Sequence, residues 1–349
     1  MTASSPPRTA PVSLTDRFPV VPADRLLRSF VPPRHFAGES FATYRPDPAY
    51  ASQAAALARL EAFAAQVAQP RRRWSRRRVA SGGIYLDGGF GVGKTHLLAS
   101  LAHAVGPDRA AYGTFVEYTH LVGALGFAPT VDALARRALV CIDEFELDDP
   151  GDTMVMSRLL RELTDRGVWL AATSNTLPDS LGEGRFAAED FLREIQALAA
   201  RFEVLRIEGS DYRHRDGAGE AEPLADADVG HHAHATPGAS LDAFPELLAH
   251  LARVHPSRFG ALLDDVSLVG LTGVGPVPDQ SAALRLVVLV DRLYDRDVPV
   301  LLGTAGPGAL FTDAMLAGGY RKKYLRALSR LGELADRGRG SVEHGLAGD

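Results

Sequence analysis

A glycine-rich stretch with a single lysine, LDGGFGVGKTHLLAS at residues 86–100, carries the strongest chemical signal in the sequence. It fits the pattern G-x-x-x-x-G-K-[ST], in which glycine backbone N–H groups turn inward around a phosphate. Lys94 is unusual, because the only other lysines among the 38 cationic side chains are Lys322 and Lys323. A compact ammonium reaches the β- and γ-phosphate oxygens of a nucleotide where a planar guanidinium does not fit. The stretch therefore predicts a nucleotide phosphate site.

Thr95 and a pair of acidic residues predict a magnesium ion beside these phosphates. The loop would contact ATP through Gly88, Gly89, Phe90, Gly91, Val92, Gly93, Lys94 and Thr95. The Thr95 hydroxyl would also bind Mg²⁺. The apolar run ALVCIDEF ends in Asp143, placed to hold the water shell of Mg²⁺, and in Glu144, placed to orient an attacking water. Without the phosphate loop, this pair could equally be a solvated acidic strand end.

Two more polar residues are candidates for the reaction itself. Asn175 ends the run VWLAATSN and could hydrogen-bond the γ-phosphate or the water, or cap a loop instead. Arg201 ends a predicted helix before the fifth strand, where a ring-forming ATPase projects a cation into the next subunit's site. Its alternative role is structural, at a helix C-terminus where a cation suits the dipole. Arg193 is the substitute candidate.

Alternating strand and helix patterns must position these residues. Apolar runs of strand length cover 82–88, 111–118, 138–145, 168–175 and 202–209. Segments with helical periodicity cover 48–69, 94–104, 119–126 continuing weakly to 137, 153–166 and 188–200. This alternation predicts an α/β fold with a parallel sheet covered by helices on both faces.

Four regions are expected along the chain. Residues 1–48 predict an extended N-terminal arm, 49–210 the phosphate-binding core, 211–239 a flexible acidic and His-rich loop, and 240–349 a smaller C-terminal α/β region. Within the last region we expect helices at 241–254, 280–294 and 318–336, and strands at 266–274 and 298–305.

Composition limits the partners and the compartment. The net charge is −5, which argues against a general nucleic-acid binder. RRRWSRRR at 71–78 could grip a polyanion, but in an arginine-biased chain it favours a solvated connector. A single cysteine and the lack of any apolar run of about 18 residues favour a cytoplasmic protein without a membrane span.

The chain resembles the ZapE cell division ATPases and their mitochondrial relatives, the Afg-type or lactation-elevated ATPases. The resemblance rests on GIYLDGGFGVGKTHL, LVCIDEFELDDPGDTM, LAATSNTLPDSLGEGRF, DYRHR, LVDRLYDRDVPVLL and RALSRLGEL, from about residue 80 to 336. It implies an AAA-type P-loop ATPase with strand order 5-1-4-3-2, Lys94 and Thr95 in Walker A, and Asp143 and Glu144 in Walker B. It also implies that Asn175 is the sensor asparagine.

The resemblance further suggests Arg326 or Arg330 as a second sensor, with a solvated helix face as the alternative. Bacterial members associate with the division-ring protein FtsZ, and mitochondrial members act in quality control of respiratory subunits. His96 stands where mitochondrial members have methionine, and such differences leave the partner open.

The sequence as a whole predicts a Mg²⁺-dependent ATPase that remodels a protein client, FtsZ being the candidate, and that assembles into a homo-oligomeric ring. Two alternatives remain open. One is an ATPase of the helicase-loader type, which would act on nucleic acid. The other is a scaffold that binds ATP with little hydrolysis.

Overall fold

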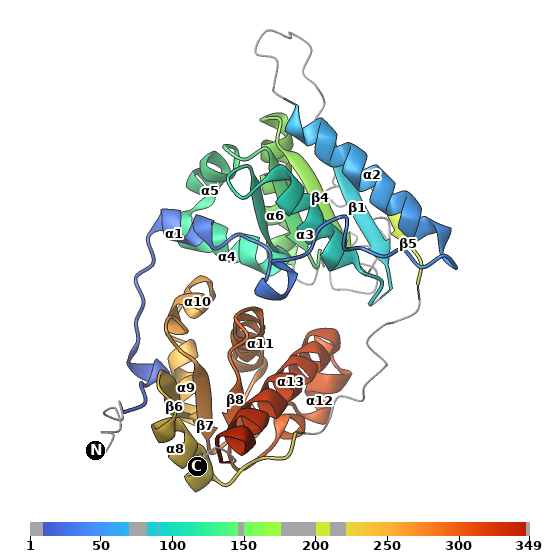
Figure 1. Ribbon diagram of the computed structural model, residues 1–349. Helices are drawn as coiled ribbons and strands as arrows, with labels where there is room; N and C mark the ends of the chain where they lie inside the picture. The colour runs from blue at the N-terminus through green and yellow to red at the C-terminus, as the bar shows by residue number, and fades with distance from the viewer. Residues whose placement is uncertain are drawn as a thin grey trace, which may run out of the picture. The chain divides into compact units, whose positions relative to one another are not determined.

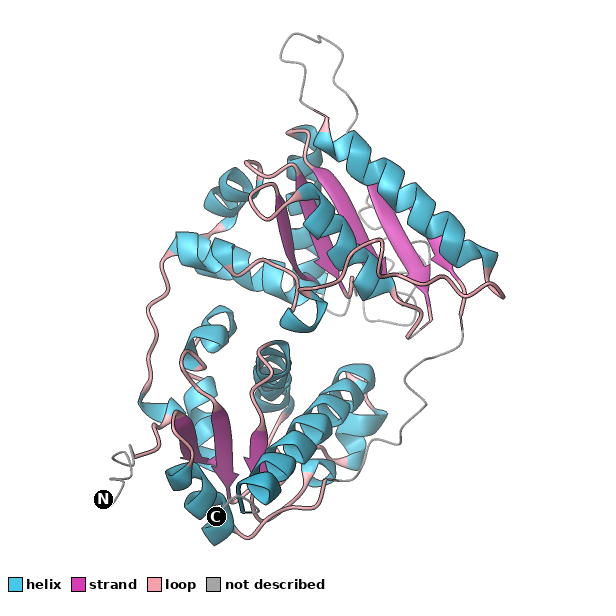
Figure 2. Ribbon diagram, viewed as in Figure 1, coloured by secondary structure: helices cyan, strands magenta, loops and turns pink. Residues whose placement is uncertain are grey.

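The chain divides into two compact units, each built around one parallel sheet (Figure 2). We call residues 22–215 the five-stranded unit, and residues 1–21 together with 216–349 the three-stranded unit. The structure is a computed structural model that describes residues 10–69, 82–89, 91–145, 150–175, 200–209 and 221–346.

The five-stranded unit has the strand order β2-β3-β4-β1-β5, with every neighbouring pair parallel. Its strands are β1 (Gly83–Gly88), β2 (Ala110–Thr114), β3 (Leu139–Asp143), β4 (Trp169–Ser174) and β5 (Phe202–Ile207). Read from the other edge, this order is 5-1-4-3-2. The predicted parallel sheet and its strand order are therefore confirmed.

Helices cover both faces of this sheet, as predicted. The α-helices described in this unit are α1 (Ala23–Arg28), α2 (Ala51–Ala68), α3 (Lys94–Val105), α4 (Phe115–Leu125), α5 (Phe127–Leu134) and α6 (Pro150–Asp165). In Figure 1, α2 and α3 cross in front of the strands, and their buried side chains form one core with alternate residues of the sheet. On the other face α4 packs on β2 and α6 on β4. Every residue of β3 is buried, as expected for a strand covered on both sides.

The strand expected at 111–118 ends early, at Thr114, because a helix begins there. The Thr114 hydroxyl accepts a hydrogen bond from the Glu117 amide, and the Glu117 carboxylate accepts one from the Thr114 amide. This reciprocal capping box starts α4 four residues before the predicted helix. Gly126, with φ of 85°, separates α4 from α5, where a single weak helix was expected.

The three-stranded unit contains the parallel sheet β6-β7-β8. Its strands are β6 (Ala239–Ala243), β7 (Leu268–Thr272) and β8 (Val300–Leu302), and its α-helices are α8 (Asp226–Ala235), α9 (Phe244–Leu251), α10 (Phe259–Leu262), α11 (Gln280–Asp295), α12 (Asp313–Ala317) and α13 (Arg321–Leu346). One apolar cluster joins α9, α10, α11 and α13 to the sheet.

The start of the described chain belongs to this three-stranded unit. Val12 forms a parallel bridge with Ser240 in β6, and Leu14 is fully buried in the main core cluster. The Asp242 carboxylate accepts hydrogen bonds from one hydroxyl and two backbone N–H groups of residues 13–15. The expected arm is thus divided, because residues up to 21 join one unit and the following residues join the other.

Two sequence-based predictions in this region are wrong. The expected loop 211–239 contains the helix α8, which forms because Val229 and Ala233, one turn apart, are fully buried against the sheet. The helix expected at 241–254 begins later, because its first residues form β6 and pair with β7. Tertiary packing outweighs the local sequence signal at both places, through side-chain burial at α8 and strand pairing at β6.

Several predictions lie outside the described residues. These are the helix 188–200 with Arg193, the arginine run 71–78, and the DYRHR motif at 211–215. Within the described ranges, none of the helices combines the length and the apolarity that crossing a membrane requires.

Candidate functional site

The phosphate loop connects the end of β1 at Gly88 to the start of α3 at Lys94. Gly91 and Gly93 have φ of 72° and 88°, in the left-handed region that glycine adopts without strain. Gly93 is the residue from which α3 begins, so the first N–H groups of the helix face the loop. Phe90 lies outside the described residues.

Close packing also requires glycine in this loop. A Cβ on Gly88 would lie 2.3 Å from the Ile207 carbonyl oxygen, and one on Gly93 would lie 2.7 Å from Cε2 of Tyr44. Tyr44 donates a hydrogen bond from its hydroxyl to the Val92 carbonyl, at 3.3 Å. The loop is therefore held from two sides, by the end of β5 and by Tyr44.

Lys94 points its ammonium back over the loop, as the phosphate-site prediction requires. Its Nζ donates to the carbonyl oxygens of Gly88 at 2.8 Å and Gly89 at 2.5 Å, and to Oδ1 of Asn175 at 2.9 Å. The side chain is only 9% exposed. The N-terminal dipole of α3 and this cation together give the loop a positive potential suited to an anion.

Thr95 and Asp143 come together at the edge of the sheet where the strands end. The Thr95 hydroxyl donates to Oδ1 of Asp143 at 3.3 Å. A hydroxyl and a carboxylate, both oxygen ligands, form the donor set that Mg²⁺ prefers. The two residues therefore fit the magnesium ion that the sequence predicts.

Asp143 is an acid in a dry environment. Burial raises its pKa, and the nearby Glu144 carboxylate raises it further. Hydrogen bonds from the hydroxyl groups of Thr173, Tyr112 and Thr95 lower the pKa but do not cancel the effect of burial. A bound cation would favour the charged form of Asp143 for the same electrostatic reason.

Glu144 follows β3 with an unusual backbone conformation. Its φ is 53°, and its amide N–H donates to the Thr173 hydroxyl at 3.0 Å and to Oδ1 of Asp143 at 3.2 Å. The side chain is partly exposed, whereas Asp143 is buried. The two neighbouring carboxylates thus have different environments, as their different expected tasks require.

Arg201 is not part of this cluster. It directly precedes β5, and its carbonyl accepts a hydrogen bond from the Gly83 amide at the start of β1. The phosphate loop follows the other end of β1, roughly 17 Å away at the usual rise per residue. The Arg201 guanidinium contacts the Thr164 hydroxyl and pairs with Asp165 at 3.9 Å, both at the end of α6.

Arg326 and Arg330 lie on α13 in the three-stranded unit, and both bind Asp291 of α11. The distances are 3.1 Å from Arg326 to Oδ2 and 2.5 Å from Arg330 to Oδ1. The Arg330 guanidinium also lies over the Tyr294 ring, 5.1 Å from its centroid. The alternative prediction that these arginines form a solvated helix face is thus wrong. Their side chains are only 20% and 23% exposed, and both pair with Asp291.

Sequence reasoning missed Tyr112 and Thr173, which flank Asp143 from β2 and β4. The Tyr112 hydroxyl donates to Oδ2 of Asp143 at 2.8 Å, and the Thr173 hydroxyl donates to Oδ1. Burial, and then the charge of Asp143, raise the pKa of Tyr112 well above its usual value, so it stays a donor. Tyr112 and Thr173 could have been found as polar residues on the same face of the sheet as Asp143. That placement requires the register of the strands, which the sequence alone does not give.

The model of the AFG1-like ATPase family matches residues 20–221 and 217–338. The cell division protein ZapE of Escherichia coli K12 is 31% identical over 144 residues, which are 38% of this chain and 38% of ZapE. An uncharacterised protein of Schizosaccharomyces pombe is 30% identical over 148 residues, 38% of this chain and 33% of that protein. The chain thus covers only between a third and two-fifths of the length of these relatives.

Among solved structures, the crystal structure of DnaI is similar, with a TM-score of 0.39 and 20% identity over 50% of this chain and 94% of DnaI. A likeness of this degree carries no argument about function. The family match is different in kind, because it extends over both units and includes the phosphate loop, Asp143 and Arg330. The chain therefore belongs to the AFG1-like ATPase family.

Proposed function

We propose that the chain binds ATP with Mg²⁺ at Gly88–Thr95 and hydrolyses it. The observation that carries the proposal is the meeting of Lys94, Thr95, Asp143 and Asn175 at one edge of the sheet, from β3, β4 and the start of α3. Family membership supports the same reaction.

Each residue has a distinct task in this proposal. Lys94 would bind the β- and γ-phosphate oxygens, and Thr95 and Asp143 would hold Mg²⁺. Bound Mg²⁺ supplies positive charge where negative charge develops on the phosphoryl group. Glu144 orients the attacking water, and Asn175, already in contact with Lys94, binds the γ-phosphate or that water.

The reaction serves, in our proposal, to remodel a protein client in the cytoplasm. The similarity to a protein named for cell division supports a client in that process, and FtsZ is the first candidate. We further propose a homo-oligomeric ring in which Arg201 acts on the nucleotide of the neighbouring subunit. The position of Arg201 supports this assignment, because it lies where the strands begin, far from the phosphate loop of its own subunit at the end of β1.

Lys94→Ala tests the nucleotide site directly. We expect isothermal titration calorimetry to show that this substitution weakens Mg²⁺–ATP binding roughly 100-fold, since a buried cation–phosphate contact is lost. Lys323→Ala is the matched control, because Lys323 lies on α13 in the other unit, with its ammonium near the Tyr320 ring. Equal affinities for the wild type and Lys94→Ala would refute the site.

A further inference from the structure

The carboxylate of Asp143 is held by side chains from the strands on both of its sides. Tyr112 of β2 donates to Oδ2, and Thr173 of β4 donates to Oδ1. The Glu144 amide and the Thr95 hydroxyl also approach Oδ1, at 3.2 and 3.3 Å. The described contacts therefore fix both oxygens of the carboxylate and leave Oδ2 with a single donor.

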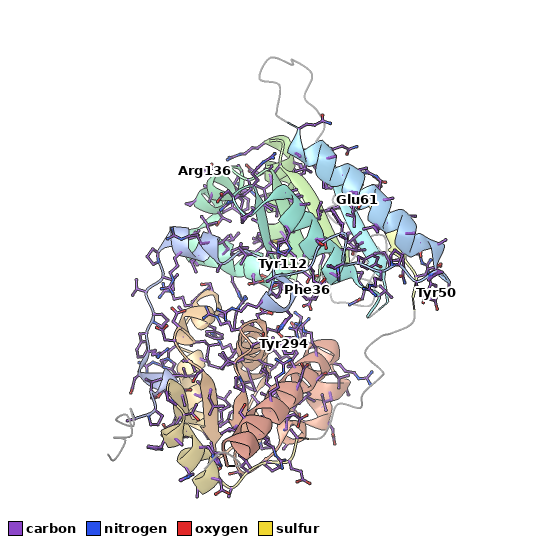
Figure 3. All side chains as sticks on the ribbon, in the orientation of Figure 1. Phe36, Tyr50, Glu61, Tyr112, Arg136 and Tyr294 are labelled. Carbon is purple, nitrogen blue, oxygen red and sulfur yellow. The ribbon has the colours of Figure 1, made fainter. Side chains whose placement is uncertain are left out.

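Strand register explains how Tyr112 reaches this carboxylate. Tyr112 pairs with Cys141, and Thr114, two residues further along β2, pairs with Asp143. Residues two apart on a strand share a face, so Tyr112 is the diagonal neighbour of Asp143, within reach of a long aromatic side chain. The phenol is 3% exposed and is labelled in Figure 3 within the five-stranded unit.

Tyr112 is not one of the residues that the phosphate-loop motif or the acidic pair identifies. It lies on a different strand from the acidic pair and belongs to none of the sequence patterns that indicate ATP binding. Its ring contributes to the apolar core between the sheet and α3, while its hydroxyl has a polar partner in Asp143. A phenylalanine would fill the same space, so packing alone does not explain the hydroxyl.

We propose that Tyr112 is a positioning residue for Mg²⁺, holding the Asp143 carboxylate in the orientation that receives the ion. The inference rests on the proposed function and extends it to a residue that does not itself touch the metal. A carboxylate fixed in advance loses less rotational freedom when the ion binds. Partners that orient a metal ligand typically contribute 10- to 100-fold to metal affinity.

Tyr112→Phe tests the proposal by removing only the hydroxyl. Binding of a fluorescent ATP analogue is followed in the full-length chain while Mg²⁺ is titrated, and again in EDTA. We expect the half-saturating Mg²⁺ concentration to rise roughly tenfold, with metal-free nucleotide binding unchanged. At saturating Mg²⁺, turnover should return close to the wild-type value, because Asp143 itself is intact.

Tyr118→Phe is the matched control. Tyr118 is also fully buried, and its hydroxyl donates to the Cys141 carbonyl of the same strand β3, at 3.1 Å. Both substitutions remove one buried phenol hydrogen bond to β3, so both should lower the melting temperature. Only Tyr112→Phe should change the Mg²⁺ requirement.

Two outcomes would overturn the inference in distinguishable ways. If the wild type binds nucleotide with Mg²⁺ but the two variants share one Mg²⁺ titration curve, Tyr112 has only a structural role and the proposed function stands. If the wild type itself shows no Mg²⁺-dependent nucleotide binding, the proposed function fails and the positioning role fails with it.

Discussion

At the scale of single residues, the backbone of Glu144 illustrates how the site is built. A non-glycine residue with a φ of 53° costs about 1 kcal/mol relative to a right-handed conformation. Two hydrogen bonds from its amide, to the Thr173 hydroxyl and to Asp143, hold that conformation. Such strain is typical of residues whose direction matters to function. In this protein the left-handed conformation of Glu144 turns the chain at the end of β3, directly after the buried Asp143.

Glu144→Gln separates an ATP-hydrolysing enzyme from a scaffold. We expect nucleotide affinity to be retained, because the amide keeps the size of the side chain, and turnover to fall by about 10² to 10⁴ because the water loses its base. Phosphate release and calorimetry measure the two quantities. Glu203→Gln, which breaks a surface ion pair with Arg59, should change neither. Unchanged turnover in Glu144→Gln would contradict the role of Glu144.

The site could be predicted from sequence wherever chemistry is local to a short segment. The loop glycines, Lys94 and Thr95 are adjacent in the chain, so their spacing alone implies a cradle. Tyr112 could not be found in the same way, because its contact with Asp143 depends on the register of β2 against β3. Long-range side-chain contacts of this kind require the fold first.

At the scale of elements, Asp291 ties α11 to α13. Burial raises the pKa of Asp291, but Arg326 and Arg330 together outweigh that effect and hold it below its usual value. The two arginines are four residues apart and so share one face of α13. The pairing relates two motifs that the sequence presents separately, LVDRLYDRDVPVLL and RALSRLGEL.

Asp291→Asn should destabilise the chain by on the order of 2 kcal/mol at neutral pH, because two largely buried arginines, 20% and 23% exposed, lose their counter-charge. Since the folded pKa of Asp291 lies below the usual 3.8, the stabilisation is complete above that value and is lost as the pH falls through the folded value. The difference in unfolding free energy between wild type and variant should therefore shrink below about pH 4. Urea unfolding of the 349-residue chain measures this difference.

Asp297→Asn is the control for this experiment, because its ion pair with Arg337 is nearly half exposed. It should cost less than about 1 kcal/mol. A pH-independent difference for Asp291→Asn would show that Asp291 contributes through packing and not through charge.

Elements were predictable where a segment's own pattern agreed with its packing. The strands and helices around the phosphate loop followed from alternating apolar runs, apart from the capping box that ends β2 early. The segment containing α8 gave no such signal, because its polar and His-rich composition hides the two residues that it buries, Val229 and Ala233. β6 was missed because its pairing with β7 is remote in sequence.

At the scale of the whole molecule, the role proposed for Arg201 would link the fold to assembly. The residue lies where β1 and β5 begin, whereas the phosphate loop follows the end of β1. There it contacts the end of α6. A cation at the beginning of these strands is too far from the phosphate loop to contact a nucleotide bound to the same subunit. Its catalytic use requires a second copy of the chain, and this requirement gives the ring proposal a direct test.

Mixing two inactive variants tests whether Arg201 acts between subunits. Arg201→Ala should lower turnover of the assembled protein by about 10³-fold or more, since the transition-state cation is lost, while leaving nucleotide affinity nearly unchanged. Lys94→Ala lacks the phosphate site but keeps Arg201. A mixture of the two should regain turnover, measured as phosphate release with assembly followed by light scattering.

The outcome of mixing decides between the two roles considered for Arg201. If Arg201→Ala alone keeps full turnover, the residue is structural, through its contacts with the end of α6. If turnover is lost but the mixture stays inactive although mixed assemblies form, Arg201 acts within its own subunit. Arg166→Ala, which removes an exposed pair with Asp132, is the control and should remain active.

The N-terminal segment that joins β6 has a consequence for biosynthesis. Leu14 hydrogen-bonds to Asp242 across 228 positions of sequence. At ribosomal speeds the partner strand emerges roughly ten to fifty seconds after the segment. Leu14 cannot take its place in this core during that interval, so the three-stranded unit completes its core only after β6 has been synthesised. Changing the segment around Leu14 therefore acts on a unit whose strands are synthesised more than 200 residues later.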